Sequence, residues 1–133
     1  MRTSDVTGKT IISLRPYKDF IAQGARVGNM LHLSGQVGTN ANHKAGKDIV
    51  EQAELAYANI KSVLAEFGAS MDNIVDETMY VTDVAEVMAN VEAVFTARAN
   101  AYGGTPEVSQ TLVQIVALVE PDLKIEIKCT AQF

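Results

Sequence analysis

The side chains that could act as nucleophile, base or metal ligand are scattered along this chain of 133 residues. Ser34, His32 and several carboxylates are present, but no spacing joins them into a hydrolytic triad. His32 alternates with apolar residues, which favours a packed or surface histidine over a catalytic base. One cysteine and two histidines give no zinc spacing, and Gly103-Gly104 is typical of a helix end rather than a phosphate loop. No metal and no nucleotide cofactor is therefore expected.

The alternating segment near the C-terminus contains the remaining candidates. Cys129 shares one side with Ile125 and Ile127, which is typical of an inert buried thiol. Glu126 lies on the other side between two lysines, where a solvated carboxylate is the ordinary interpretation. Only further context could give Glu126 a chemical role.

Charge and hydropathy narrow the range of partners. The formal net charge is −5, tryptophan is absent and no stripe of Lys or Arg occurs, so neither nucleic acid nor an anionic membrane is an expected partner. Apolar residues come in short periodic groups, and the segment MRTSDVTGKT lacks the apolar stretch of a signal peptide. We expect a cytoplasmic protein whose partners are a small molecule and other protein subunits.

Helix signals are the clearest local patterns. Asp48 with Glu51 forms a capping-box pattern before an apolar stripe that ends at Gly68. A second helix is predicted after Asp83, ending at Gly103-Gly104.

Strand signals surround these two helices. Residues 10–14 form a short β-branched run, and Gly28-Asn29 separates two apolar pieces as in a hairpin. A strand is predicted within DETMYVTD, between the helices. A nearly continuous apolar strand is predicted over 111–119, with a tight connection to the alternating strand after Pro121.

The element order is thus β-β-β-α-β-α-β-β within one domain, residues 1–133. Such an order predicts an α+β fold in which two helices cover one face of a single mixed sheet. The other face stays open and the apolar strand calls for burial on both sides, so we expect an oligomer that packs sheet faces together.

Four segments in sequence order resemble the reactive intermediate deaminase family, also called Rid or YjgF. They are VGNMLHLSGQVG, QAELAYANIKSVLAEFGASMDNIV, TMYVTDVAEV and TLVQIVALVEPDLKIEIKCTA. The resemblance covers about residues 20 to 131. It implies a chorismate-mutase-like fold, a homotrimer with clefts between subunits, and cofactor-free hydrolysis of enamines or imines to 2-keto acids and ammonia.

The resemblance also assigns roles to individual residues. Glu126 matches a glutamate that handles water, and Ser34 matches a cleft-lining serine. Tyr17 is the nearest match to a cleft tyrosine. Gln110 occupies the place of an arginine that grips a substrate carboxylate, and its neutral amide lacks the charge and the bidentate fork of arginine. Glu92 stands where the family often has asparagine, and it would repel an anionic substrate.

Two hypotheses remain open from the sequence. The first is a hydrolase of enamines or imines with an atypical substrate preference, which uses Glu126. The second is a non-catalytic trimer that binds a small ligand, an imine or a carboxylate, or has a regulatory role.

Overall fold

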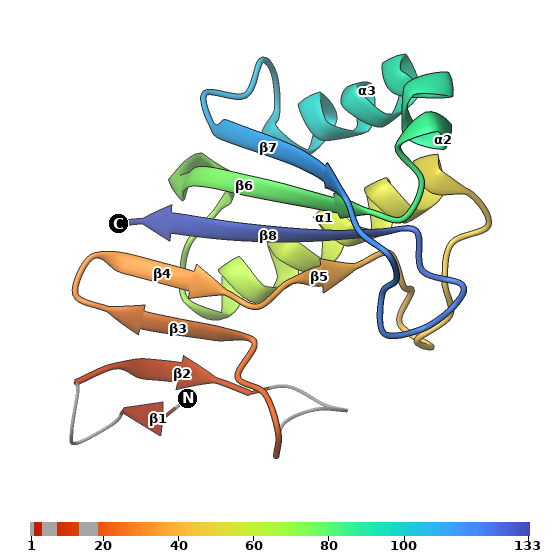
Figure 1. Cartoon of the computed structure of the whole chain (residues 1–133). Helices are drawn as coiled ribbons and strands as arrows, with labels where there is room; N and C mark the ends of the chain where they lie inside the picture. Colours follow the sequence, from red (N-terminus) through yellow and green to blue (C-terminus); the bar gives the residue numbers. More distant parts are fainter. Residues whose placement is uncertain (1, 4–7, 14–18) are drawn as a thin grey trace.

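One mixed sheet organises the molecule. The computed structural model describes residues 2–3, 8–13 and 19–133. Across the sheet the strands follow the order β1-β2-β3-β4-β8-β6-β7, and β5 pairs with β8 (Figure 1). Their bounds are β1 Arg2–Thr3, β2 Thr10–Ile12, β3 Gly24–Val27, β4 Met30–Leu33, β5 Gln36–Val37, β6 Ile74–Val81, β7 Ser109–Gln114 and β8 Ile125–Gln132. Strands β6 and β7 are parallel and the other pairs antiparallel, so the sheet is mixed as predicted.

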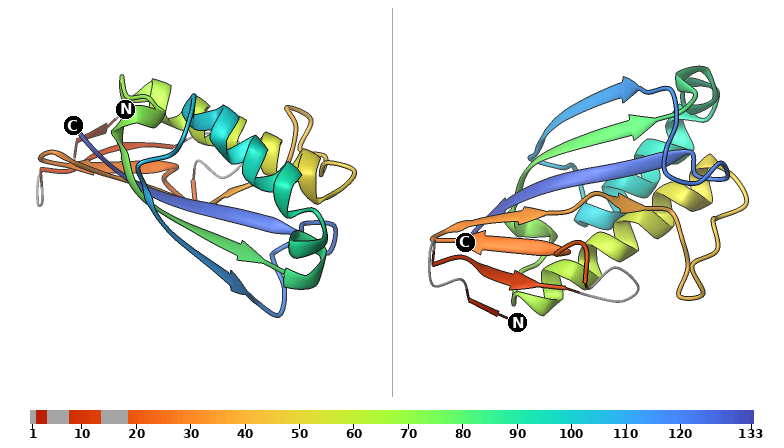
Figure 2. Two further views of the ribbon diagram at one scale, coloured as in Figure 1. Left: turned by 90° about the horizontal axis from the view of Figure 1, so that it is seen from above. Right: turned by 60° about the horizontal axis from the view of Figure 1, so that its bottom comes forward.

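Helices cover one face of this sheet (Figure 2). They are α1 Ile49–Glu66, α2 Val84–Ala89 and α3 Val91–Tyr102, and a short 3-10 helix, η1 Met71–Asn73, leads into β6. We call the covered side the helix face and the other side the open face. The apolar stripe of α1 is buried on the helix face, against apolar side chains of β4, β6 and β8; the fully enclosed members of this core include Leu31, Ile60, Leu64, Met79, Ile125 and Ile127. The architecture is the predicted α+β class.

The local signals at the hairpin and at the helix starts are confirmed. Gly28 has φ +58, a left-handed conformation that glycine adopts without strain, and it joins β3 to β4. Asp48 accepts a hydrogen bond from the Glu51 N–H at 2.8 Å and begins α1. Asp83 likewise accepts from the N–H groups of Ala85 and Glu86 at the start of α2.

The second predicted helix is divided in two, which corrects the expectation of two helices. At Asn90 the backbone turns to φ −121, ψ 25, and α2 ends there. The Asn90 side-chain amide donates to the Glu86 carbonyl at 2.9 Å, so it replaces a main-chain donor in the last turn. Asparagine competes for backbone groups in this way, and apolar periodicity alone does not detect it.

The predicted strand over 111–119 and its tight connection are wrong. Strand β7 ends at Gln114, and residues 115–124 form a loop in which Val116 is fully exposed. The Gln114 side chain accepts from the Val84 N–H at 2.8 Å and binds the strand end to α2. Strands β7 and β8 do not pair, because β6 lies between them. Apolar composition indicated a buried strand, but this segment is exposed in the single chain.

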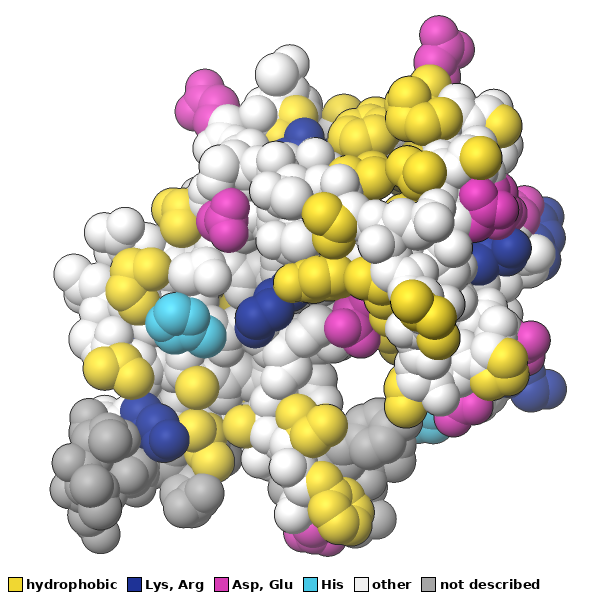
Figure 3. All heavy atoms as spheres, in the orientation of Figure 1, with side chains coloured by type: hydrophobic (Ala, Val, Ile, Leu, Met, Phe, Trp, Pro, Cys, Tyr) yellow, Lys and Arg dark blue, Asp and Glu magenta, His cyan; other side chains and the backbone are white. Residues whose placement is uncertain are grey.

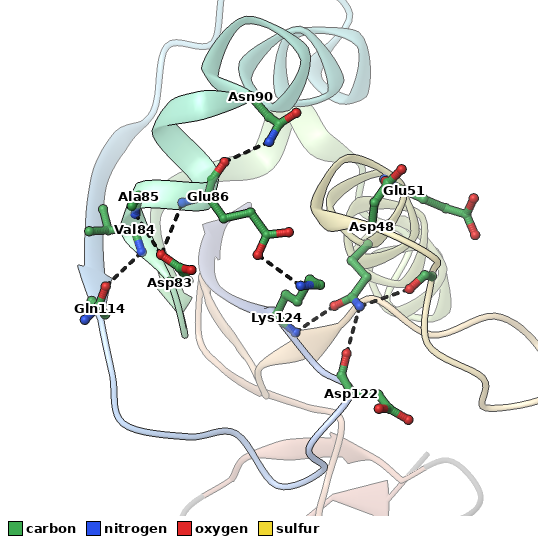
Figure 4. A network of polar contacts seen from close by, with 12 residues as sticks. Asp48, Glu51, Asp83, Val84, Ala85, Glu86, Asn90, Gln114, Asp122 and Lys124 are labelled. Atoms are coloured by element: carbon green, nitrogen blue, oxygen red, sulfur yellow. Dashed lines mark hydrogen bonds and ion pairs between the residues drawn. The ribbon is translucent and has the colours of Figure 1, made fainter.

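Polar contacts fix the end of that loop against the helices. The buried Gln52 side chain of α1 donates to the Asp122 carbonyl at 2.9 Å and accepts from the Lys124 N–H at 2.7 Å. Lys124 also forms an ion pair with Glu86 of α2 at 3.0 Å (Figure 4). These contacts hold the segment that directly precedes β8, whose second residue is Glu126.

Within the described residues, no helix has the length and apolar character needed to cross a membrane.

Candidate active site

Glu126 lies on the open face, near the centre of the sheet. It pairs across the ladder with Tyr80 of β6 and with Val37 of β5. Its neighbours Ile125 and Ile127 point to the helix face and are fully buried, as strand alternation requires. Glu126 itself is partly exposed. On the open face, groups of hydrophobic side chains lie among uncharged polar and backbone atoms, and charged side chains are few (Figure 3).

The Glu126 carboxyl group packs directly on the backbone of Gly35. A Cβ atom built on Gly35 would lie 2.7 Å from both Cδ and Oε2 of Glu126. Only glycine leaves room for the carboxylate at this distance. The turn that follows β4 therefore packs against the Glu126 side chain.

Ser34 belongs to that same turn. Its hydroxyl donates to the Ala22 carbonyl at 2.6 Å, and its N–H donates to the Gln23 carbonyl at 2.8 Å. Gln36 adds a side-chain bond to Gln23 at 2.8 Å and one to the Ser34 carbonyl at 3.1 Å. The structure thus brings Ser34 and Glu126 to one place, on either side of Gly35, and holds the turn with contacts to the segment before β3.

The two lysines that flank Glu126 in sequence bond elsewhere. The Lys128 ammonium donates to the Leu33 carbonyl at 2.7 Å, and Lys124 pairs with Glu86. Among the described residues, neither lysine therefore forms an ion pair with Glu126.

Gln110 lies on the other side of the sheet from Glu126. It pairs in register with Glu77 of β6, and Glu77 pairs with Cys129 of β8; both of these neighbours are buried under the helices. Paired residues share a face, so Gln110 points to the helix face. Its amide nitrogen is buried and finds no hydrogen-bond partner among the described residues. Within one chain, Gln110 and Glu126 do not form a single site.

The structure gives the positions of some of the other candidate residues named from the sequence. Tyr17 lies outside the described residues. His32 is exposed on β4. Cys129 is buried as predicted, and burial, with the charges of Glu77 and Asp76, raises the pKa of its thiol. Among the described residues no group of His, Cys, Asp or Glu has the geometry of a metal site.

A buried charge network on the helix face was missed by sequence reasoning. Glu77 is fully buried and accepts from Tyr57 of α1 at 2.9 Å, from Tyr102 of α3 at 2.6 Å and from Arg98 Nε at 3.0 Å. Burial is the main cause that raises the pKa of both tyrosines, and the Glu77 carboxylate raises it further. The sequence contained a signal for this network, because Glu77 lies on the same face of its strand as the apolar residues Met79 and Val81.

A groove of about 740 Å³ lies outside the sheet, between α1 and α3. Its floor includes Tyr57 and Ala97, and its rim carries Glu54, Lys61 and Glu92. Ser34, Gln110 and Glu126 do not line it. Glu92, which stands where the family often has asparagine, therefore lies at the edge of this outer groove.

Comparisons with known proteins agree with this architecture. The family model described as endoribonuclease L-PSP matches residues 9–133. An Escherichia coli protein named 2-iminobutanoate/2-iminopropanoate deaminase is 33% identical over 115 residues, which are 82% of this chain and 84% of that protein.

Solved structures give the same result. Rv2704 of Mycobacterium tuberculosis, a member of the YjgF/YER057c/UK114 family, superposes with a TM-score of 0.79 at 25% identity, covering 94% of this chain and 99% of that chain. The E. coli protein TdcF, solved with bound serine, has a TM-score of 0.75 at 25% identity and covers 92% of each chain. The fold is thus the chorismate-mutase-like α+β fold of these proteins, and the chain belongs to the endoribonuclease L-PSP family, also called YjgF or Rid.

Proposed function

We propose that this protein hydrolyses an enamine or imine to a carbonyl compound and ammonia, without a cofactor, and that Glu126 activates the water. The observation that carries this proposal is the position of Glu126, whose carboxylate lies against Gly35 beside Ser34 on the open face. A carboxylate held in this way is a suitable general base for water.

The reaction balances with water as the only co-reactant. Glu126 accepts a proton from water as the water oxygen adds to the imine carbon, and this proton passes to the imine nitrogen, which gives a neutral carbinolamine. Glu126 then takes the proton of the carbinolamine hydroxyl and passes it to the nitrogen, so that the C–N bond breaks and ammonia leaves as the C=O bond forms. An enamine first takes a proton on carbon and releases one from nitrogen, which converts it to the imine. No metal or redox group is required for any of these steps.

The proposed assembly is a homotrimer with the active cleft between subunits. Gln110 lies on the helix face and Glu126 on the open face, so one cleft can contain both only if neighbouring subunits contribute one each. Val113, Val116 and Val119 expose apolar surface on β7 and its loop, which supports burial against another copy. Light scattering should give three times the mass of the chain, and Val116→Glu should lower that mass. A wild-type monomer with full activity would rule out the shared cleft.

The names of relatives support the reaction class. One relative is named for 2-iminobutanoate and 2-iminopropanoate, and TdcF was solved with serine, so small compounds related to amino acids are the ligands of those proteins. The family description names a ribonuclease, but a net charge of −5 gives no attraction for a phosphate backbone. Cytoplasmic location stays a prediction, and one yeast relative is named as mitochondrial.

The test is release of ammonia from imines generated enzymatically in the assay. Wild-type protein should raise the rate above the spontaneous hydrolysis, and Glu126→Gln should remove the increase. Glu120→Gln, a change in the exposed loop before β8, is the matched control and should keep full activity. Equal rates for wild type and Glu126→Gln would contradict the proposed role.

A second candidate function is a trimer that binds a small ligand without turnover. The neutral Gln110, in the place of the expected arginine, favours it. That function predicts a rise in melting temperature with a small ligand and no ammonia release from any imine tested.

A further inference from the structure

The helix face beside Gln110 contains a charge pair at its centre. Arg98 of α3 is almost fully buried, with 11% of its side chain exposed, and its Nε donates to Glu77 Oε1 at 3.0 Å. Glu77 has no exposed side-chain surface. Tyr57 and Tyr102 donate to the same carboxylate. Every strong contact of Glu77 is therefore made inside the protein.

The network has no net charge. Glu77 contributes one negative and Arg98 one positive charge, while burial and the Glu77 carboxylate raise the pKa of both tyrosines, which keeps them neutral. The positive charge of Arg98 is therefore neutralised by Glu77. A buried ion pair of this kind is stable only when its partners neutralise one another.

Gln110 lies directly beside this pair. It is the ladder partner of Glu77 on the neighbouring strand, and it shares the helix face with it. Arg98 Nη2 also reaches the Val108 carbonyl at 3.4 Å, two residues before Gln110 in the chain. The Arg98 guanidinium thus contacts both Glu77 and the residue that directly precedes β7.

A cation at position 110 would be unfavourable here. It would place a second guanidinium beside Arg98, with one carboxylate to neutralise both. Glutamine avoids that repulsion, but its amide nitrogen stays buried without an acceptor among the described residues. A buried N–H donor is costly without a hydrogen-bond acceptor, and an uncharged oxygen is a sufficient acceptor.

We propose that Glu77 and Arg98 are specificity-determining residues, and that with Gln110 they select a ligand that offers an uncharged hydrogen-bond acceptor, such as an amide or ketone oxygen, instead of a carboxylate. The inference rests on the proposed function for the location of the cleft. It names the substrate class as a neutral imine or enamine.

The test compares two ligands that differ only in charge, 2-oxobutanamide and 2-oxobutanoate, by titration calorimetry. Wild-type protein should bind the amide about tenfold more tightly than the carboxylate. Gln110→Arg should reverse that preference. Ser62→Arg adds the same charge on the exposed surface of α1, away from β7, and should leave the ratio of dissociation constants unchanged.

Glu77→Gln tests the ion pair itself. It keeps the shape of the side chain and leaves Arg98 with an uncompensated charge, so affinity for 2-oxobutanoate should rise about tenfold. If this variant does not fold, the preference of the wild-type protein between the two ligands still decides the matter. Wild-type preference for the carboxylate would overturn the inference, as would a folded Glu77→Gln with the wild-type ratio. Binding of neither ligand would also overturn it, while ammonia release in the Glu126 assay would continue to report on the proposed function.

Discussion

Glu77 and Glu126 lie on adjacent strands at the centre of one sheet, yet their surroundings differ in nearly every respect. Glu77 is on the helix face, fully buried, with an arginine and two tyrosines bonded to it. Glu126 is on the open face, partly exposed, with its carboxylate against the backbone of Gly35. A carboxylate whose acceptor sites are taken up by protein donors has a structural role, whereas one placed beside a turn and solvent can act on water.

Arg98→Met should have the largest effect on stability, because it leaves Glu77 buried and unpaired. We expect a loss of about 3–5 kcal/mol in the free energy of unfolding. Urea denaturation measures it, with Glu126→Gln as the comparison, expected within about 0.5 kcal/mol of wild type. A loss below about 1 kcal/mol for Arg98→Met would show that Glu77 is not held as a charge.

Gly35→Ala should displace the Glu126 carboxylate. The new methyl group would lie 2.7 Å from the Glu126 carboxyl carbon, so the side chain or the turn must move. Because the carboxylate ends a flexible and partly exposed side chain, we expect a loss of at most about 1 kcal/mol in stability, and a lower kcat with the loss of the carboxylate position. Denaturation and ammonia release check both quantities. Unchanged kcat would mean that Glu126 does not need its contact with Gly35.

Stability at high pH should depend on the tyrosines of the Glu77 network. Because their pKa values are raised in the folded state, the unfolded chain releases these protons near pH 10 while the folded chain retains them. Stability is therefore fully present below pH 10 and should fall above it, by about 1.4 kcal/mol per pH unit for each tyrosine.

Tyr57→Phe removes one of these groups, so its stability should fall less steeply above pH 10 than that of wild type. Denaturation at a series of pH values measures both slopes. The same slope in the variant would show that Tyr57 ionises normally in the folded protein.

Lys124→Met should have the smallest effect. It removes the ion pair with Glu86, whose two side chains are 35% and 30% exposed, in contrast to the buried pair of Arg98 and Glu77. We expect a change of about 0–1 kcal/mol, measured by urea denaturation. A loss of stability as large as that of Arg98→Met would mean that burial does not explain how much each ion pair contributes.

Much of the fold was predictable from local sequence. The caps at Asp48 and Asp83, the hairpin at Gly28 and the alternation around Cys129 each have a short-range physical cause, and each is confirmed. The end of β7 was not predictable, because apolar residues over 115–119 look like a strand when their exposure is unknown. Which strands pair is a long-range property, so the place of β6 between β7 and β8 appeared only in the structure.

The site was predictable only in part for the same reason. The resemblance pointed to Ser34 and Glu126, and the structure brings them together beside Gly35. It gave no sign that Gln110 lies on the opposite face, since strand register sets that relation. Arg98 is distant from Gln110 along the chain, and only the packing of α3 over β6 and β7 places it there.

The measurement that tests the division of roles most directly is ammonia release by Glu126→Gln, measured together with its free energy of unfolding. The account predicts a decrease in kcat of at least about 100-fold, with stability within about 0.5 kcal/mol of wild type. Wild-type turnover by a stable Glu126→Gln protein would contradict the account.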